Sequence, residues 1–333
     1  MIDRDRIRGV CAMMPAFTTP DGGSVEARNT VDLDELTAAV DRTIEDGVDM
    51  IATMGTFGEF YSLLWSEQQT LIEATVRAVR GRVPLMIGCT STNTREALDK
   101  MRFIRDAGAD GVITGVPFYM PCTPDNGVQF YLDIADQFPD LGIMIYHNPE
   151  FHHVTLPISG FKELVTRPNI IAMKDSHRNV DAFVALMDIV QDNIKIFVRQ
   201  GQLFPYALLG AAGCWSIDVW MGPWPILRLR DACASGDWET ARGIARELTK
   251  LNPTSDIRWR DHVMKLSIND SGYCTAGPLR PPFRRIPDSV IAEAKSRGER
   301  WRELAEHHRA AMVGAAALKK EPQYTGGTEG GES

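Results

Sequence analysis

Short runs of apolar residues alternate with longer amphipathic stretches along almost the whole chain. Each run is nearly continuous in apolar residues, as expected for parallel strands that are covered on both faces. Eight such runs predict eight strands, at residues 9–17, 50–55, 84–89, 111–116, 142–147, 170–175, 194–200 and 214–219.

The stretches between these runs carry apolar residues at three- and four-residue spacing, which is typical of amphipathic helices. Several end on a glycine such as Gly108, a favoured residue just beyond a helix. Ser66 and Gln69 have the spacing of a capping box at the start of another helix. No glycine-rich phosphate loop follows a strand, so the repeated units predict an α/β fold, a (β/α)₈ TIM barrel, in preference to a doubly wound sheet.

Three further helical patterns follow the eighth unit, at residues 237–250, 256–269 and 288–317. We expect them to form extra C-terminal helices packed on the barrel, not an independent fold. The predicted organisation is a barrel over residues 1–225, a helical extension over 226–320 and a disordered tail over 321–333. The tail is rich in glycine and glutamate and cannot build a core.

Composition narrows the possible partners. The 333 residues are 44% hydrophobic and 24% charged, with a formal net charge of -8, which disfavours nucleic-acid binding. No apolar segment is long enough for a membrane span, and the first ten residues lack the apolar run of a signal peptide, so we expect a cytoplasmic protein. The six cysteines include no C-x-x-C pair, so neither a disulfide framework nor a zinc knuckle is indicated.

Lys174 is the main candidate for chemistry. Catalytic groups of barrel enzymes lie at the carboxyl ends of the strands, and Lys174 ends the apolar run that starts at Ile170. Apolar surroundings disfavour an ammonium ion and supply the free amine that attacks a ketone. The alternative is a lysine at the frayed end of a strand that either reaches solvent or pairs with Asp175, and position alone does not decide between this and the catalytic role.

Two further strand ends provide possible partners for this amine. Tyr146 ends the strand that neighbours the lysine strand, so its phenol can move protons near the amine. Gly55 and Gly58 flank consecutive backbone N–H groups that can bind a carboxylate, and Thr56 adds a hydroxyl donor. A tyrosine that only packs, and an ordinary glycine–threonine turn, remain the alternatives.

The histidines of one loop are possible metal ligands. His147, His152 and His153 lie close together with Glu150 between them. Their spacing fits no standard zinc pattern, and adjacent residues of an extended chain point to opposite sides. We therefore predict no metal site and expect His152 to shape the pocket.

Four segments together carry a family resemblance: GTFGE at 55–59, the Tyr146 loop, the lysine strand at 170–176 and AGPLRPPF at 276–283. In this order and spacing the chain resembles the dihydrodipicolinate synthase / N-acetylneuraminate lyase superfamily of class I aldolases. The resemblance implies a (β/α)₈ barrel, usually a homotetramer, in which Lys174 forms an imine with pyruvate. It also implies that the 55–59 amides and Thr56 bind the pyruvyl carboxylate and that Tyr146 is the proton shuttle.

Two departures from the better-known members bear on the substrate. Phe57 stands where the lysine-pathway enzyme has a second threonine, and Phe151 where it has an arginine for a second carboxylate. Both changes disfavour aspartate semialdehyde, and an aromatic mouth is poorly equipped for sugar acids. Such a mouth suits an arene, although simple core packing is the alternative. The expected aromatic residues are Phe57, Phe118, Phe151, Trp215 and Trp220.

The chain looks most similar to the hydratase-aldolases of polycyclic aromatic hydrocarbon breakdown, on the phenanthrene and naphthalene routes. These convert an arylidene-pyruvate and water to an aromatic aldehyde and pyruvate. The resemblance implies that an iminium on Lys174 serves both steps without metal or organic cofactor. Asn148 and Tyr146 would hold the water, and Trp215 would contact the arene.

Several assignments stay open at this stage. Asn269 resembles a substrate-contacting asparagine, with a helix cap as the alternative, and Tyr119 matches a family tyrosine that can reach across a subunit interface. An ortho-carboxyl or ortho-hydroxyl group on the arene could meet Arg178, His152 or Asn269. The alternative functions are a sugar-acid or hydroxyproline-pathway aldolase or dehydratase, and a non-catalytic keto-acid-binding barrel.

Overall fold

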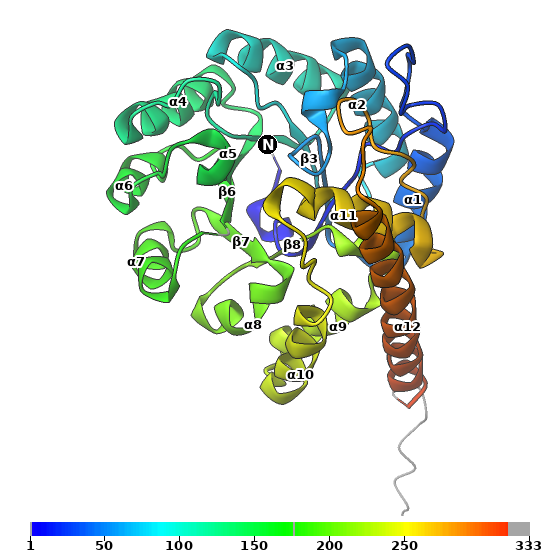
Figure 1. Ribbon diagram of the computed structural model, residues 1–333. Coiled ribbons are helices and arrows are strands. Elements are labelled where there is room, and N and C mark those ends of the chain that lie inside the picture. The colour runs from blue at the N-terminus through cyan, green and yellow to red at the C-terminus, as the bar shows by residue number, and fades with distance from the viewer. Residues whose placement is uncertain (1, 176, 319–333) are drawn as a thin grey trace, which may run out of the picture.

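The computed structural model describes residues 2–175 and 177–318. Eight parallel strands close into one barrel in sequence order, with helices around the outside (Figure 1). This confirms the predicted (β/α)₈ barrel. Six of the eight strands end one to four residues earlier than predicted, the first at Met13 and the eighth at Ser216. The strands are β1 (Gly9–Met13), β2 (Met50–Thr53), β3 (Leu85–Gly88), β4 (Gly111–Thr114), β5 (Gly142–His147), β6 (Ile170–Asp175), β7 (Lys195–Arg199) and β8 (Gly213–Ser216).

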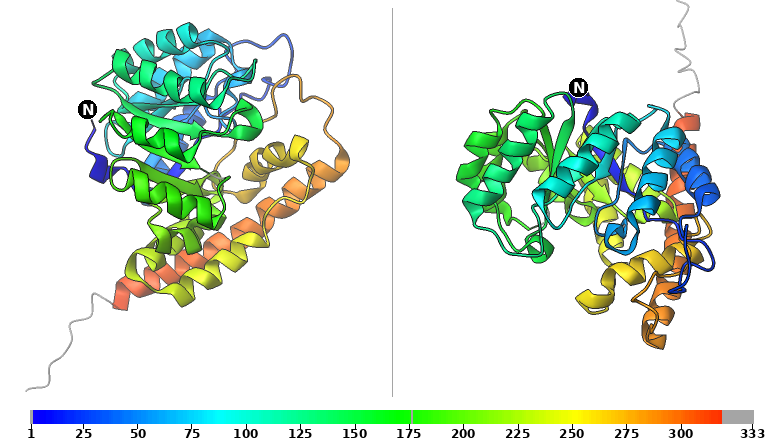
Figure 2. Two further views of the ribbon diagram at one scale, coloured as in Figure 1. Left: turned by 90° about the vertical axis from the view of Figure 1, so that its left-hand side faces the viewer. Right: turned by 90° about the horizontal axis from the view of Figure 1, so that it is seen from above.

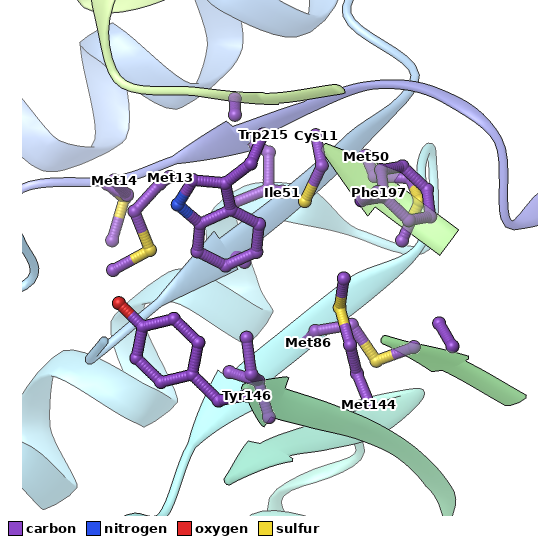
Figure 3. Packing of buried hydrophobic residues seen from close by; sticks show 14 of the residues in the cluster. Cys11, Met13, Met14, Met50, Ile51, Met86, Met144, Tyr146, Phe197 and Trp215 are labelled. Carbon is purple, nitrogen blue, oxygen red and sulfur yellow. The ribbon is translucent and has the colours of Figure 1, made fainter. Parts of the chain in front are cut away.

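The barrel interior is filled by side chains and contains many sulfur atoms. Figure 3 shows the side chains of Cys11, Met50, Met86 and Met144 gathered between the strands. All four are buried, and flexible methionines fill irregular gaps well. The floor beneath the carboxyl ends of the strands is therefore a packed core and not a pore.

Helices cover the outside of the barrel and begin at local signals in the chain. Asp32, Asn93, Thr123 and Asn179 each accept a backbone N–H at a helix start. The helices of this layer are α1 (Leu33–Glu45), α2 (Trp65–Val79), α3 (Thr94–Ala107), α4 (Pro124–Gln137), α5 (Pro149–His152), α6 (Phe161–Leu164), α7 (Val180–Val190), α8 (Leu203–Tyr206) and α9 (Trp224–Ser235).

The capping box predicted at Ser66 and Gln69 is wrong. The N-cap of helix α2 is Leu64, two residues earlier, and the Glu67 carboxylate accepts the backbone N–H of Leu64 at 2.8 Å. The same carboxylate also accepts the backbone N–H of Thr30, a contact from a distant part of the chain. Tertiary contacts therefore decide where this helix starts.

Three more helices follow the barrel, as predicted: α10 (Trp238–Thr249), α11 (Ile257–Ser271) and α12 (Asp288–Leu318). Figures 1 and 2 show α12 running along the outside of the molecule, while α11 lies at one end of the barrel. Arg297 of α12 donates to both carboxylate oxygens of Asp218, each at 2.7 Å, just after β8. Buried contacts thus join the extension to the barrel.

The expected division of the chain stays a prediction. Its boundary at residues 225 and 226 falls inside α9, and the tail expected at 321–333 lies outside the described residues. Among the described helices, none is long and apolar enough to cross a membrane.

Candidate active site

Strands β5 and β6 place Tyr146 directly beside Lys174. The two residues are register partners, and the lysine Nζ lies 5.1 Å from the centre of the phenol ring. The register shifts by one residue near the start of the pair, where Ile143 pairs with Ile170 but Met144 pairs with Ala172. Without this irregularity, Tyr146 would pair with Met173.

Lys174 is buried, with 8% of its surface exposed, so the alternative of a solvent-exposed lysine is wrong. Burial lowers the pKa of its amine to about 8, and the positive charges of Arg199 and Arg260 act in the same direction. The charges of Asp175 and Asp261 oppose them. At pH 7 about one tenth of the molecules therefore carry the free amine that nucleophilic attack requires, far more than an ordinary lysine would supply.

Tyr146 joins the lysine to the loop after β2. Its phenol donates to Thr56 Oγ1 at 3.1 Å, and burial raises the pKa of the phenol, so it carries its proton. Its ring stacks on Trp215 of β8, with centroids 6.0 Å apart and planes at 29° (Figure 3). Asn148, two residues after Tyr146, is also buried, and its side chain interacts with the phenol.

The loop at 55–58 is packed so closely that it requires a glycine at position 58, while at Gly55 an added Cβ would press on the end of a flexible methionine. A Cβ atom on Gly58 would lie 2.5 Å from the backbone nitrogen of Met54, and one on Gly55 would lie 3.0 Å from Met13 Cε. Met54 itself has a positive φ of 55°. This turn leaves Thr56 facing Tyr146, while Phe57 is buried.

The side chains of His147, Asp175 and Arg178 form a second polar group, which includes the residue that follows Lys174. Leu156 N–H donates to His147 Nε2 at 3.2 Å, so the other ring nitrogen carries the proton and donates to Asp175 at 3.3 Å. Arg178 pairs with the same carboxylate and donates to Leu156 O at 2.8 Å. Burial alone would raise the pKa of Asp175, but the bond from His147 and the charge of Arg178 hold it well below its usual range. Among the described residues, the hydrogen-bonded partners of the Asp175 carboxylate are therefore His147 and Arg178, and it acts on Lys174 through its charge.

His152 forms a wall of the site. Its ring packs edge-on against Tyr146 at 5.5 Å, and burial lowers its pKa to about 4, so it is neutral near pH 7. A Cβ atom on Gly115 would lie 2.0 Å from the ring, so the wall depends on that glycine. Within residues 2–175 and 177–318, no three histidine, cysteine or acidic side chains are arranged to hold a metal ion.

Other expected site residues lie apart from this group. Trp220 is fully buried and donates to Met13 O at 2.7 Å, so its prediction as a mouth residue is wrong. Both amide atoms of Asn269 bond to the backbone of Gly277, at 3.0 and 3.2 Å. Phe151 is 38% exposed and Tyr119 is 77% exposed, and neither has a polar contact with Lys174 among the described residues.

A buried ionic network, which was not predicted from the sequence, holds the 55–59 loop. Glu59 accepts from Lys265 of α11 at 2.5 Å and from Arg280 at 2.8 Å. Lys265 also donates to Thr18 at 2.7 Å, and Arg280 donates to the carbonyl of Ala16 at 2.7 Å. Glu59 and Arg280 lie in the 55–59 and 276–283 segments that carry the family resemblance, but their sequence context predicts no role for either side chain. Nothing near Lys265 in the sequence indicates its contact with Glu59, because the two residues are 206 positions apart.

The sequence also indicates only part of an aromatic cluster that begins at Phe60, directly after Glu59. Phe60 packs edge-on against Phe118 at 6.1 Å and against Tyr61 at 5.7 Å. Tyr61 packs against Phe283 at 6.4 Å, and Phe283 lies 4.1 Å from the ring of His262. Of the aromatic residues expected at the mouth, Phe118 belongs to this cluster, whose other members follow the 55–59 loop or come from the C-terminal segment.

Strand β6 thus presents a buried lysine of lowered pKa beside a protonated phenol on β5, and such an amine is able to attack a ketone. The sequence profile of the Dihydrodipicolinate synthetase family matches residues 13–296. The chain belongs to this family, which confirms the predicted resemblance and the enzyme class of carbon–carbon lyase.

Among its relatives, the trans-O-hydroxybenzylidenepyruvate hydratase-aldolase of Pseudomonas putida is 31% identical over 316 residues, 90% of this chain and 94% of that protein. A trans-2'-carboxybenzalpyruvate hydratase-aldolase from a Nocardioides species is 27% identical over 322 residues, 92% of this chain and 96% of the relative. The solved structure of PhdJ bound to substrate intermediate superposes with a TM-score of 0.87 at 28% identity. The superposition covers 92% of this chain and 99% of the PhdJ chain.

Proposed function

We propose that this protein is a Schiff-base hydratase-aldolase that converts an arylidene-pyruvate and water to an aromatic aldehyde and pyruvate. The observation that carries the proposal is the buried amine of Lys174 beside the Tyr146 phenol, with Trp215 stacked on that phenol. The relatives named above, one acting on a hydroxybenzylidene-pyruvate and one on a carboxybenzalpyruvate, support an aryl-substituted 2-keto acid as substrate.

The first half of the reaction is hydration. The free amine of Lys174 attacks the C2 ketone, and loss of water gives an iminium conjugated with the C3–C4 double bond. Gly55 and Thr56 hold the carboxylate. Water held by Asn148 and Tyr146 adds to C4 and releases a proton, and a proton is taken up at C3. The iminium is restored and C4 now carries a hydroxyl group.

The second half is cleavage. Tyr146, through its bond with Thr56, relays the proton lost by the C4 hydroxyl as the C3–C4 bond breaks. The bonding electrons enter the iminium, the aromatic aldehyde leaves and an enamine remains on Lys174. Protonation at C3 and hydrolysis release pyruvate and the free amine. One iminium accepts electrons in both halves, so the proposed route uses no metal and no organic cofactor.

Reduction with borohydride in the presence of pyruvate tests the Schiff base. Mass spectrometry is expected to locate one reduced adduct on Lys174, and Lys174→Ala is expected to lose both the adduct and turnover. Lys162→Ala, at an exposed lysine of α6, is the matched control. Absence of the adduct, or retained turnover by Lys174→Ala, contradicts the mechanism.

A substrate panel tests the rest of the proposal. Arylidene-pyruvates are expected to be cleaved, whereas sugar keto-acids and a hydroxyproline-pathway substrate are not. Cleavage of a sugar keto-acid with inert arylidene-pyruvates would assign the alternative aldolase function. An adduct without turnover of any compound would assign a keto-acid-binding barrel.

We also infer a homotetramer. Tyr119 and Met120, in the loop after β4, are 77% and 72% exposed, and such apolar side chains favour contact with another subunit. Sedimentation analysis of the wild type and of Tyr119→Lys tests this inference, and a monomeric wild type contradicts it. The cytoplasmic location stays a prediction from the sequence.

A further inference from the structure

His147 is a buried histidine that the proposed reaction does not use. Its side chain is 2% exposed, and it follows Tyr146 on β5. Its register partner is Asp175, so this pair comes directly after the pair of Tyr146 and Lys174. Tyr146 points into the barrel (Figure 3), and side chains alternate across a strand, so the imidazole lies on the other side of β5. His147 can therefore act on the reaction only through the groups that it holds.

The imidazole joins β6 to the end of the loop after β5. Its Nε2 accepts the backbone N–H of Leu156 at 3.2 Å, and its Nδ1 donates to Asp175 at 3.3 Å. Arg178 donates to the carbonyl oxygen of the same Leu156 at 2.8 Å. Leu156 belongs to no helix or strand, yet both of its backbone polar groups are bonded to side chains of one buried cluster.

These bonds close the base of the loop at residues 148–155, which lines the candidate active site. The loop supplies Asn148, which interacts with the Tyr146 phenol, and His152, whose ring packs edge-on against that phenol at 5.5 Å. Backbone bonds within the loop form the single turn α5, and so short a turn is marginal by itself. The bonds at its base therefore determine where Asn148 and His152 lie.

The protonation state of His147 suits this role. Burial lowers the pKa of the imidazole, and the charges of Arg178 and Lys174 act in the same direction. The hydrogen bond and the charge of Asp175 oppose them without reversing the shift. Near pH 7 the ring is therefore neutral, so Nε2 can accept from Leu156 while Nδ1 donates.

Asp175 has other partners that keep it in place without the imidazole. Its carboxylate also pairs with Arg178 and accepts the backbone N–H of His177 at 3.1 Å. Loss of the imidazole therefore removes a contact of the loop, while the end of β6 that carries Lys174 keeps its remaining contacts.

We propose that His147 is a positioning residue for the hydration step: through Leu156 it holds the 148–155 loop so that Asn148 keeps the attacking water at C4 of the iminium. This inference rests on the proposed function. Lys174 and Tyr146 lie on the strands themselves, so imine formation and cleavage depend less on the loop. Loss of the imidazole is expected to slow hydration more than cleavage.

The test measures the two halves of the reaction separately in single turnovers. Loss of the conjugated absorbance of an arylidene-pyruvate reports hydration, and aldehyde release from the C4-hydroxylated keto acid reports cleavage. In His147→Leu the hydration rate is expected to fall at least about tenfold more than the cleavage rate, because a small displacement of a positioned reactant has an effect of this size. His308→Leu, at a buried histidine of α12 bonded to Glu247 at 3.0 Å, is the matched control and should leave the ratio unchanged.

Two amide variants identify which bond of the imidazole matters. Glutamine reaches about as far as Nε2 and can accept from Leu156, whereas asparagine reaches only as far as Nδ1 and can bond to Asp175. The ratio of the two rates in His147→Gln is therefore expected to lie nearer to the wild type than the ratio in His147→Asn. This comparison decides the matter even if His147→Leu does not fold, and borohydride trapping of pyruvate on Lys174 shows which variants have folded.

An equal fall in the two rates of His147→Leu, or no fall in either, overturns the inference. A ratio in His147→Gln that is no nearer to the wild type than that in His147→Asn also overturns it. If the wild type traps pyruvate but hydrates no arylidene-pyruvate, the proposed function has failed and this inference falls with it. If the wild type hydrates the substrate and the His147 variants keep the wild-type ratio, only this inference is removed.

Discussion

Tyr146 lies opposite Lys174 because the register of β5 and β6 shifts by one residue below them. Side chains alternate across a strand, so a one-residue slip would place Met173, not Lys174, beside the tyrosine. The irregularity therefore brings a phenol and an amine from two strands to the same side of the barrel mouth. Five predictions concern this site and the contacts that hold it.

Replacing Tyr146 by phenylalanine separates imine formation from turnover. Tyr146→Phe keeps the stack on Trp215 but loses the hydroxyl that bonds to Thr56. We expect kcat to fall about one hundred- to ten thousand-fold, in the range typical of a lost acid–base group, while borohydride still traps pyruvate on Lys174. Tyr273→Phe, which loses a hydroxyl bonded to Asp46 outside the site, is the control. Unchanged kcat in Tyr146→Phe would contradict the proton-relay role.

The pH dependence of kcat/KM is expected to report the pKa of Lys174. That pKa is lowered to about 8, so the rate rises with pH through this value and levels above it, as the amine loses its proton. At pH 7 about one tenth of the molecules carry the free amine. A rate that falls as pH rises from 6 to 8 would be inconsistent with attack by this amine.

Substitutions at two neighbouring residues of α11, Arg260 and Asp261, should shift the pH at which kcat/KM rises in opposite directions. The charge of Asp261 raises the pKa of Lys174, whereas that of Arg260 lowers it. Asp261→Asn is therefore expected to shift the rising limb to lower pH, and Arg260→Gln to shift it to higher pH. The two side chains bond to each other at 3.2 Å, so in the wild type their opposite effects on Lys174 partly cancel. Asp270→Asn, further along the same helix, serves as the control, and shifts of the same sign in both variants would refute the assignment.

The glycines of the 55–58 loop are expected to be necessary for substrate binding. Gly58→Ala would force a Cβ atom to within 2.5 Å of Met54 N, so the loop has to move. We expect a KM increase of at least tenfold and a loss of about 1–3 kcal/mol in the free energy of unfolding. Gly201→Ala, where an added Cβ meets nothing within 4 Å, is the matched control. Unaltered kinetics of Gly58→Ala would exclude the loop as the carboxylate site.

The network around Glu59 is expected to stabilise both the fold and the loop. Glu59→Gln leaves two buried cations, Lys265 and Arg280, without their carboxylate. We expect a loss of about 3–5 kcal/mol in the free energy of unfolding, measured in urea. Glu73→Gln breaks an exposed pair with Arg77 at 3.7 Å and should change stability by less than about 1 kcal/mol. Equal effects of the two substitutions would show that the buried network adds nothing.

Much of the architecture follows from the sequence alone. Continuous apolar runs predicted parallel strands, and eight of them with intervening helices predicted a closed barrel. Because parallel strands of a barrel end at one face, Lys174, Tyr146 and Thr56 could be assigned to that face from their positions in the chain. The order of strands also predicted that Tyr146 and Lys174 are neighbours.

Only the tertiary structure decided how these residues meet. The register shift between β5 and β6, the stack of Trp215 on Tyr146, and the burial of Trp220 away from the mouth depend on packing across the barrel. The bond between Lys265 and Glu59 joins residues 206 positions apart. Local patterns reflect neighbours within one helix or strand, whereas these contacts arise where separate elements close on one another, which periodicity does not encode.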